Sequence, residues 1–256
     1  MRGEHEVRDR TNVAPPIPPM AARIAQRVLV NYRVDPTVAQ SLLPRGLRPQ
    51  LIAGQAVAGI CLIHLTAFRP AWFALEIGHR SRNAAHRIAV EWDTADGPAT
   101  GVYIPRRHSS SRLARLAGGR VFPGTHLPAA VVFRTTDSDL TVDVGADDLR
   151  VHVAGRRGAG IPFRSRLFDT LEESSTFFRK DAVGWSPSRS GRLEGLRLST
   201  DAWRVEPLVV TDLASTFFEA LPAGSAEFDH ALFMHDVPTR WSGVSTPAPS
   251  PRLLQD

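Results

Sequence analysis

Residues 101–133 read GVYIPRRHSSSRLARLAGGRVFPGTHLPAAVVF, and the order of residue types in this stretch indicates the fold. Its first and last residues include Val, Ile, Tyr and Phe, which are typical of strands. Between them lie a basic turn, a serine run that can cap a helix and a glycine pair that can end it. The stretch therefore predicts a strand, a short helix after Ser109–Ser111 and a second strand.

The start of this predicted helix lies beside Arg106, Arg107 and His108. Free backbone N–H groups and positive side chains together favour the binding of an anion. No acidic residue occurs between Gly97 and Thr136 to balance this charge locally. Two interpretations stay open: an anion site, or an ordinary capped helix among solvated surface arginines.

Strand signals also dominate the rest of the chain, with Val, Ile, Phe and Thr in short runs that Gly and Pro separate. Predicted helices are fewer: one runs from Asp35 to about Leu43, one starts near Asp169, and one spans Asp212 to about Ala220. The pattern predicts an α+β fold with a mainly antiparallel curved sheet, or an incomplete β-barrel or cone, and a few short helices. The predicted strands are Arg27–Val34, Ala56–Ala67, His86–Asp93, Gly101–Ile104, Ala129–Thr135, Leu140–Val144, Leu149–Ala154, Arg192–Ser199 and Phe228–His235.

The length of 256 residues suits one large domain. Residues 1–20 and 242–256 are poor in large apolar side chains and rich in proline or serine, which predicts a flexible arm and a flexible tail around a single domain at residues 21–241. No apolar run reaches the ~18 residues that a membrane span needs. The first residues carry charges and prolines where a signal peptide needs an apolar stretch. We therefore expect a soluble, cytoplasmic protein with no membrane partner.

Several kinds of chemistry are excluded by the residues themselves. The single cysteine, Cys61, rules out a disulfide framework and any multi-cysteine metal site. The sequence contains no G-x-S-x-G, Walker or H-E-x-x-H motif. His230 and His235 are five residues apart in a predicted strand and would point to opposite faces. We expect no metal and no cofactor, and we expect Cys61 to be a buried, inert residue.

His86 is a candidate for either of two roles. It shares a predicted strand face with Ile88 and Val90, so it is either a hydrogen-bonded core residue or, if this face lines a cavity, a donor or proton carrier there. Arg87 and Glu91 would lie on the opposite face, where we expect surface charges.

The order of these segments resembles the acetoacetate decarboxylase-like superfamily, in particular its YqjF-like branch. The resemblance covers roughly Arg27 to Trp241 and implies a sheet-rich cone or barrel around a central pocket. The segments that carry it are VNYRVDPTVAQSLLPRGLRPQLIAGQAVAGICLIHL at 30–65, NAAHRIAV at 83–90, GVYIPRR and SSSRLARLAGGRVFPG within 101–124, and FRKDAVGWSPSRSGRLEGLRL at 178–198.

The resemblance does not extend to the covalent chemistry of the decarboxylases. These enzymes place a Schiff-base lysine just after a GFP-like turn, with its pKa lowered by desolvation and a neighbouring cation. Here the turn reads RVFPGTH at 120–126, and the lysine position falls on Gly124 or Thr125, neither of which can form an imine. The only lysine, Lys180, lies in the later hairpin segment and is expected at the surface. The glutamate expected on the central strand falls near alanines 84 and 85.

Five polar residues remain around the implied pocket. Arg106, with Tyr103 and Asn83, is expected to bind a small carboxylate or carbonyl ligand, and His126 or His86 could move protons near neutral pH. The leading hypothesis is a small-molecule-binding domain, and the alternative is an enzyme that uses histidine acid/base chemistry on such a substrate. Nucleic-acid binding through the arginine-rich segment is less favoured, because the chain offers no known nucleic-acid module. The sequence is compatible with a homo-oligomer.

Overall fold

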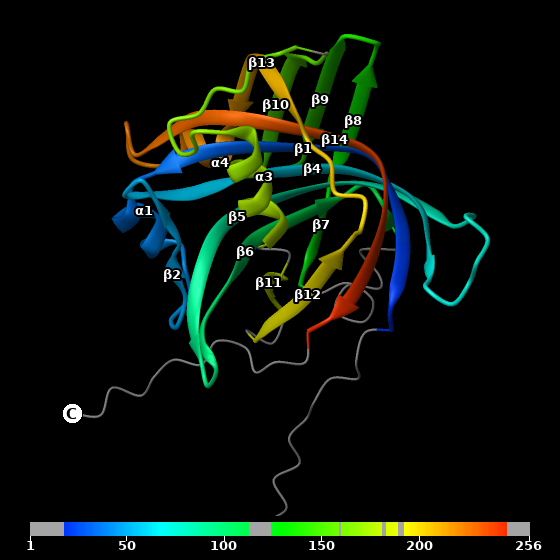
Figure 1. The fold of residues 1–256 in the computed structure, drawn as a ribbon, viewed down its shortest axis with the longest axis horizontal. Helices are drawn as coiled ribbons and strands as arrows, with labels where there is room; N and C mark the ends of the chain where they lie inside the picture. Colours follow the sequence, from blue (N-terminus) through cyan, green and yellow to red (C-terminus); the bar gives the residue numbers. More distant parts are fainter. Residues whose placement is uncertain (1–17, 113–123, 159, 181–182, 189–191, 245–256) are drawn as a thin grey trace, which may run out of the picture.

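Strands dominate the computed structural model, which describes residues 18–112, 124–158, 160–180, 183–188 and 192–244 (Figure 1). The helices in these ranges are short, and none of them is long and apolar enough to cross a membrane. The elements are β1 Met20–Val34, α1 Pro36–Ser41, β2 Arg48–Pro49, β3 Leu51–Ile52, β4 Gln55–Pro70, β5 His79–Thr94, β6 Gly97–Ser109, β7 His126–Pro128, β8 Ala130–Thr135, β9 Asp139–Gly145, β10 Arg150–Arg156, α3 Leu171–Lys180, β11 Val183–Pro187, β12 Leu193–Ser199, β13 Glu206–Ser215, α4 Thr216–Glu219 and β14 Ala226–Gly243.

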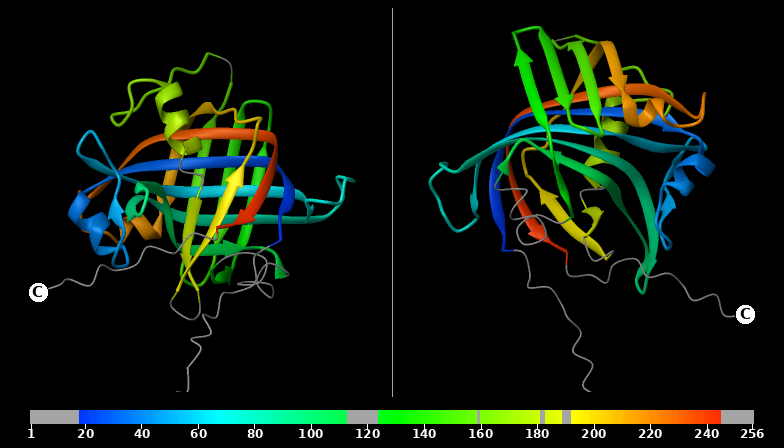
Figure 2. Two further views of the ribbon diagram at one scale, coloured as in Figure 1. Left: turned by 60° about the horizontal axis from the view of Figure 1, so that its bottom comes forward. Right: turned by 180° about the vertical axis from the view of Figure 1, so that it is seen from behind.

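The strands form one large, strongly curved sheet, which Figure 2 shows from two further directions. Its strand order is β1-β4-β5-β6-β11-β12-β14-β13-β10-β9-β8, and β14 pairs with β1 as well, so the curved sheet returns to its first strand. The sheet is mixed, because β6 runs parallel to β7 and to β11 while the other pairings of the described strands are antiparallel. A curved sheet with a few short helices confirms the α+β prediction.

Two helices begin within two residues of their predicted starts, and capping explains both. The Asp35 carboxylate accepts hydrogen bonds from the backbone N–H groups of Thr37 and Val38 at 2.8 and 3.1 Å. In α3, the backbone N–H of Glu173 donates to Thr170 Oγ1 and the backbone N–H of Thr170 donates to the Glu173 carboxylate. This reciprocal pair is a capping box.

The helix expected from Asp212 to about Ala220 was wrong over its first half. Strand β13 continues to Ser215, and α4 spans only Thr216–Glu219. Asp212 pairs with Ala154 of β10, so the strand ladder overrides the local helix signal.

Two further expectations concern a predicted helix and the end of the predicted domain. The helix expected after Ser109–Ser111 falls within residues 113–119, which lie outside the described residues. Strand β14 ends at Gly243, two residues past the expected domain boundary, because Ser242 and Gly243 pair with β12.

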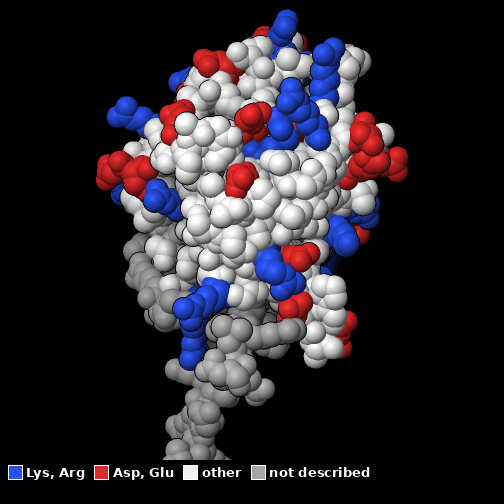
Figure 3. All heavy atoms as spheres, turned by 90° about the vertical axis from the view of Figure 1, so that its left-hand side faces the viewer, with Lys and Arg blue, Asp and Glu red and all other residues white. Residues whose placement is uncertain are grey.

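Acidic and basic side chains are interspersed on the face that carries α1 (Figure 3). Elsewhere, two arginines of the basic segment pair with acids that are distant in sequence. Arg106 lies 3.3 Å from Asp148, and Arg134 lies 2.5 Å from Asp143. Exposed pairs of this kind contribute little to stability, but they cancel local charge.

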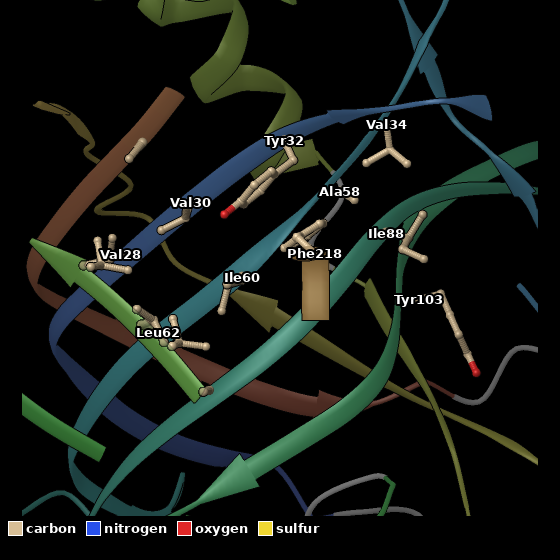
Figure 4. Packing of buried hydrophobic residues seen from close by; sticks show 14 of the residues in the cluster. Val28, Val30, Tyr32, Val34, Ala58, Ile60, Leu62, Ile88, Tyr103 and Phe218 are labelled. Carbon is tan, nitrogen blue, oxygen red and sulfur yellow. The ribbon is translucent and has the colours of Figure 1, made fainter. Parts of the chain in front are cut away.

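The central strands are buried on both faces, which explains their nearly continuous apolar sequences. The side chains labelled in Figure 4 come from one face of β1, β4, β5 and β6 and from α4, and the rings of Tyr32 and Phe218 stack there with centroids 3.8 Å apart. The alternate residues of the same strands, such as Leu29 and Val57, face a second core that α3 covers with Phe178. The second face is the one that holds the candidate site.

Candidate functional site

A cavity of about 130 Å³ lies on the α3-covered face of β1, β4, β5 and β6, and β11, β12 and β14 complete its walls. Most lining side chains are apolar, among them Ile63, Ile104 and Leu198. The polar or titratable lining side chains that matter below are Arg27, Cys61, Asn83, Arg87, Arg107 and His126.

The structure divides the five predicted site residues between two faces of the sheet. Asn83 and His126 line the cavity, whereas His86, Tyr103 and Arg106 do not. Asn83 and His86 are three residues apart in β5, so strand alternation sends their side chains to opposite faces.

A register shift between β5 and β6 explains why Arg107, rather than Arg106, lines the cavity. The pairs His86–Arg106 and Ile88–Tyr103 differ by one residue in register, so β6 carries one extra residue between them. Such an insertion reverses the alternation of all side chains that follow it. Without it, Arg106 would point into the cavity; with it, Arg107 does.

Arg87 contradicts the expectation of a surface charge. Arg87 is only 5% exposed and lines the cavity. Its guanidinium lies 4.4 Å from the centroid of the Phe178 ring. One of its N–H groups donates to the side-chain oxygen of Asn31. Glu91 does pair at the surface, with Arg48 at 3.3 Å. The two charges of this strand face differ because α3 covers the sheet at Arg87.

His86 is a core residue rather than a cavity residue. Its ring is fully buried and stacks on Phe217 of α4 with centroids 4.3 Å apart. Neither ring nitrogen has a hydrogen-bond partner among the described residues. Burial is the main cause that lowers the pKa of His86 to about 3, so the ring is neutral at physiological pH.

Arg107 and His126 lie on neighbouring strands in the cavity wall. They are register partners on the parallel strands β6 and β7, and Arg107 Nε donates to Ser186 Oγ at 2.8 Å. Burial lowers the pKa of Arg107 to about 10, which leaves the guanidinium charged at neutral pH. Burial and the Arg107 charge lower the pKa of His126 to about 4, so this imidazole is neutral at the same pH.

The described lining residues of the cavity carry positive charge and include no acid. No Asp or Glu is among its described lining residues, and no described ion pair includes Arg27 or Arg107. Arg27 Nε donates to Cys61 Sγ at 3.2 Å, and its guanidinium lies 5.8 Å from the centroid of the Trp203 ring. Cys61 is half-buried and lines the cavity, whereas a buried residue was expected.

Neither residue at the position that the resemblance implies for a lysine carries an amine, and Gly124 has no room for a side chain. Gly124 has φ +79°, and a Cβ on it would lie 2.6 Å from the Cβ of Ser186. Thr125 is exposed, and Lys180 is exposed at the end of α3, as expected. Within the described ranges, no three His, Cys, Asp or Glu side chains are grouped to hold a metal ion.

The sequence did not place any of the three cavity arginines in the pocket, although it named Arg107 beside the candidate anion site; these residues are Arg27, Arg87 and Arg107. One of them had a usable signal, because alternation from Asn83 passes through Ala85 to Arg87 on the same face. Arg107 had none, since the register shift depends on pairing with another strand.

Known structures show the same fold. An acetoacetate decarboxylase-like enzyme from Sphingomonas wittichii RW1 superposes with a TM-score of 0.54 at 14% identity, over 91% of this chain and 94% of that chain. An acetoacetate decarboxylase superposes with a TM-score of 0.54 at 11% identity, over 94% and 93%. The enduracididine biosynthesis enzyme MppR, complexed with the condensation product of pyruvate and imidazole 4-carboxaldehyde, gives 0.50 at 14% identity, over 90% and 88%.

Sequence comparison places the chain more narrowly. A search of curated proteins finds no match. Residues 21–233 match the DUF2071 family, described as "Uncharacterized conserved protein". This match spans the curved sheet from β1 into β14 and includes every cavity arginine, and the chain therefore belongs to the DUF2071 family, with an acetoacetate decarboxylase-like fold.

Proposed function

We propose that this protein binds a small carboxylate in the cavity and does so without Schiff-base chemistry. The observation that carries the proposal is the half-buried guanidinium of Arg107, which lies in a cavity whose described lining residues include no acid. A buried charge is costly unless it is paired, and a guanidinium pairs with a carboxylate through two parallel hydrogen bonds.

The other lining groups suit a ligand with a short organic body. Arg27 and Arg87 add positive charge, and most of the other lining side chains are apolar. MppR is complexed with a condensation product of pyruvate, which makes pyruvate a suitable first probe. Methyl pyruvate has nearly the same shape without the negative charge, so it is the matched neutral probe.

The substitution Arg107→Gln is expected to weaken pyruvate binding by roughly 10- to 100-fold, because it removes a charge-assisted pair worth about 1.5–3 kcal/mol. Isothermal titration calorimetry of wild type and variant measures this loss. The control is Arg106→Gln, the neighbouring arginine that pairs with Asp148 outside the cavity, and its affinity should equal that of the wild type.

Two results of this titration would contradict the proposal. The first is a wild-type protein that binds neither pyruvate nor acetoacetate. The second is equal affinity for pyruvate and methyl pyruvate, which would show that the cavity arginines do not read the charge.

A second candidate function is acid/base catalysis on the bound carboxylate, and the pairing of His126 with Arg107 favours it. The His126 imidazole is neutral at pH 7 and can accept a proton, and its pKa of about 4 makes it a weak base. We propose that Arg107 holds the carboxylate while His126 removes a proton from the carbon next to the carbonyl and then returns one, which leaves the substrate composition unchanged.

Exchange of the pyruvate methyl protons in D₂O tests this second candidate. Proton NMR should show loss of the methyl signal in the presence of wild type, and His126→Gln should reduce the rate by roughly 100-fold or more. Borohydride should trap no covalent adduct during exchange, because no imine forms. An adduct on Lys180, or unchanged exchange in His126→Gln, would overturn this assignment.

A further inference from the structure

A continuous chain of hydrogen bonds leads from the cavity wall to a buried carboxylate. Arg87 donates to the Asn31 side-chain oxygen. The Asn31 side-chain nitrogen lies 3.0 Å from His230 Nε2, and His230 Nδ1 lies 2.7 Å from Asp229 Oδ2. The side chains of Asp229 and His230 are 1% and 2% exposed. Only Arg87, the first member, lines the cavity.

In each of these hydrogen bonds, only one of the two groups can be the donor. A guanidinium can only donate, so the Asn31 oxygen must accept, and the Asn31 amide N–H then faces His230 Nε2. Nε2 must accept and Nδ1 must carry the proton that it donates to Asp229. Burial lowers the pKa of His230, which favours this neutral ring. Although burial raises the pKa of Asp229, the bonds from His230, Ser165 and the Arg166 backbone outweigh it and keep the acid ionised.

The sheet register gives Arg87 a path to Asn31. Asn31, Gly59 and Arg87 are cross-strand partners on β1, β4 and β5, so the Arg87–Asn31 bond spans β4 at a residue that has no side chain. On the other side, the ring of Phe178 covers the guanidinium. The group is thus held between sheet and helix, in one orientation.

Ser174, His230 and Asp229 include the residue types of a serine-hydrolase triad, with Ser174 Oγ 2.8 Å from His230 Nε2. Ser174 is fully buried and is not among the cavity-lining residues, so a substrate in the cavity does not reach its hydroxyl. The cluster of Asp229, His230 and Asn31 is connected to the cavity by the hydrogen bond between Asn31 and Arg87.

We propose that Asn31, His230 and Asp229 are positioning residues that hold the Arg87 guanidinium ready to bind the carboxylate ligand. This inference rests on the proposed function. A guanidinium fixed before binding loses little rotational freedom when the ligand arrives. The three residues Asn31, His230 and Asp229, here called the relay, therefore raise affinity without touching the ligand.

A double-mutant cycle on pyruvate affinity tests the relay, with Asn31→Leu, Arg87→Gln and both together. Each single variant should weaken binding by about tenfold, and the double variant should be no weaker than Arg87→Gln alone. Ser174→Ala is the matched control, since it contacts the same histidine but lies off the line, and its affinity should stay within twofold of wild type. Losses that multiply in the double variant, or a Ser174→Ala loss as large as that of Asn31→Leu, would overturn the relay.

A ligand-free readout separates the relay from the proposed function. The ¹⁵N NMR signal of the Arg87 side chain, assigned with Arg87→Lys, should shift and exchange faster in Asn31→Leu. If wild type binds no carboxylate but this signal responds, the proposed function fails and the positioning of Arg87 stands; an unaffected signal overturns the relay. Should Asn31→Leu not fold, Asn31→Asp serves: its carboxylate would engage Arg87 in place of the ligand, and binding should weaken likewise.

Discussion

Gly59→Ala is expected to lower the free energy of unfolding by at least about 3 kcal/mol, or to prevent folding altogether. A Cβ on Gly59 would lie 2.2 Å from the carbonyl oxygen of Val30 in the neighbouring strand. The oxygen and the Cα that would carry this Cβ both belong to the backbone in the middle of the sheet, where β4 is paired on each side, so neither strand can move away. Overpacking against an immobile neighbour is among the few mechanisms that give so large an effect.

Urea denaturation measures this change, and Gly145→Ala provides the control. Gly145 ends β9, and a Cβ there would meet nothing within 4 Å, so this variant should stay within about 0.5 kcal/mol of wild type. Equal unfolding midpoints for the two variants would show that β1 and β4 are not held as closely as described.

Acid is expected to destabilise the protein below about pH 6.5, with His86 as a main cause. An unfolded histidine binds a proton near pH 6.5, whereas the pKa values of the buried His86 and His126 are lowered to about 3 and about 4. Between these limits the unfolded chain binds more protons than the folded chain. The free energy of unfolding must therefore fall as the pH falls through this window.

His86→Leu should remove the His86 part of this pH dependence. One group contributes at most about 1.4 kcal/mol per pH unit, so over these 2.5 units the variant should lose about 3 kcal/mol less than wild type between pH 6.5 and 4. It also removes two ring nitrogens that lack hydrogen-bond partners in the described chain, so it should be more stable at pH 7 as well. Thermal unfolding across this range measures both effects.

His235→Gln is the control for the acid experiment, because His235 is exposed on β14. It should reproduce the wild-type pH dependence. The interpretation of His86 fails if His86→Leu and wild type lose the same stability between pH 6.5 and 4.

The alternation of side chains along a strand predicts part of the cavity lining. Asn83 and His86 were both expected around one pocket, yet their odd separation in a strand already assigns them to opposite faces. Arg87 follows from the same rule. Its depth does not, since the cover over it comes from Phe178, which is 91 positions later in the chain.

Local sequence does not determine whether Arg106 or Arg107 faces the cavity. Both are arginines in the same strand, and local sequence treats them alike. The extra residue in β6 is defined only by the pairing with β5, so the side that each guanidinium faces is a property of two strands together.

By themselves, the residues of this chain determined the strand-rich α+β class, the starts of α1 and α3, and the absence of a lysine at positions 124 and 125. These features depend on neighbours within a few positions. Only the tertiary structure decided which arginines line the cavity and brought Asn31, His230 and Asp229 into one line behind Arg87. The physical reason is that register, burial and charge balance arise from contacts between distant segments, and no local pattern encodes them.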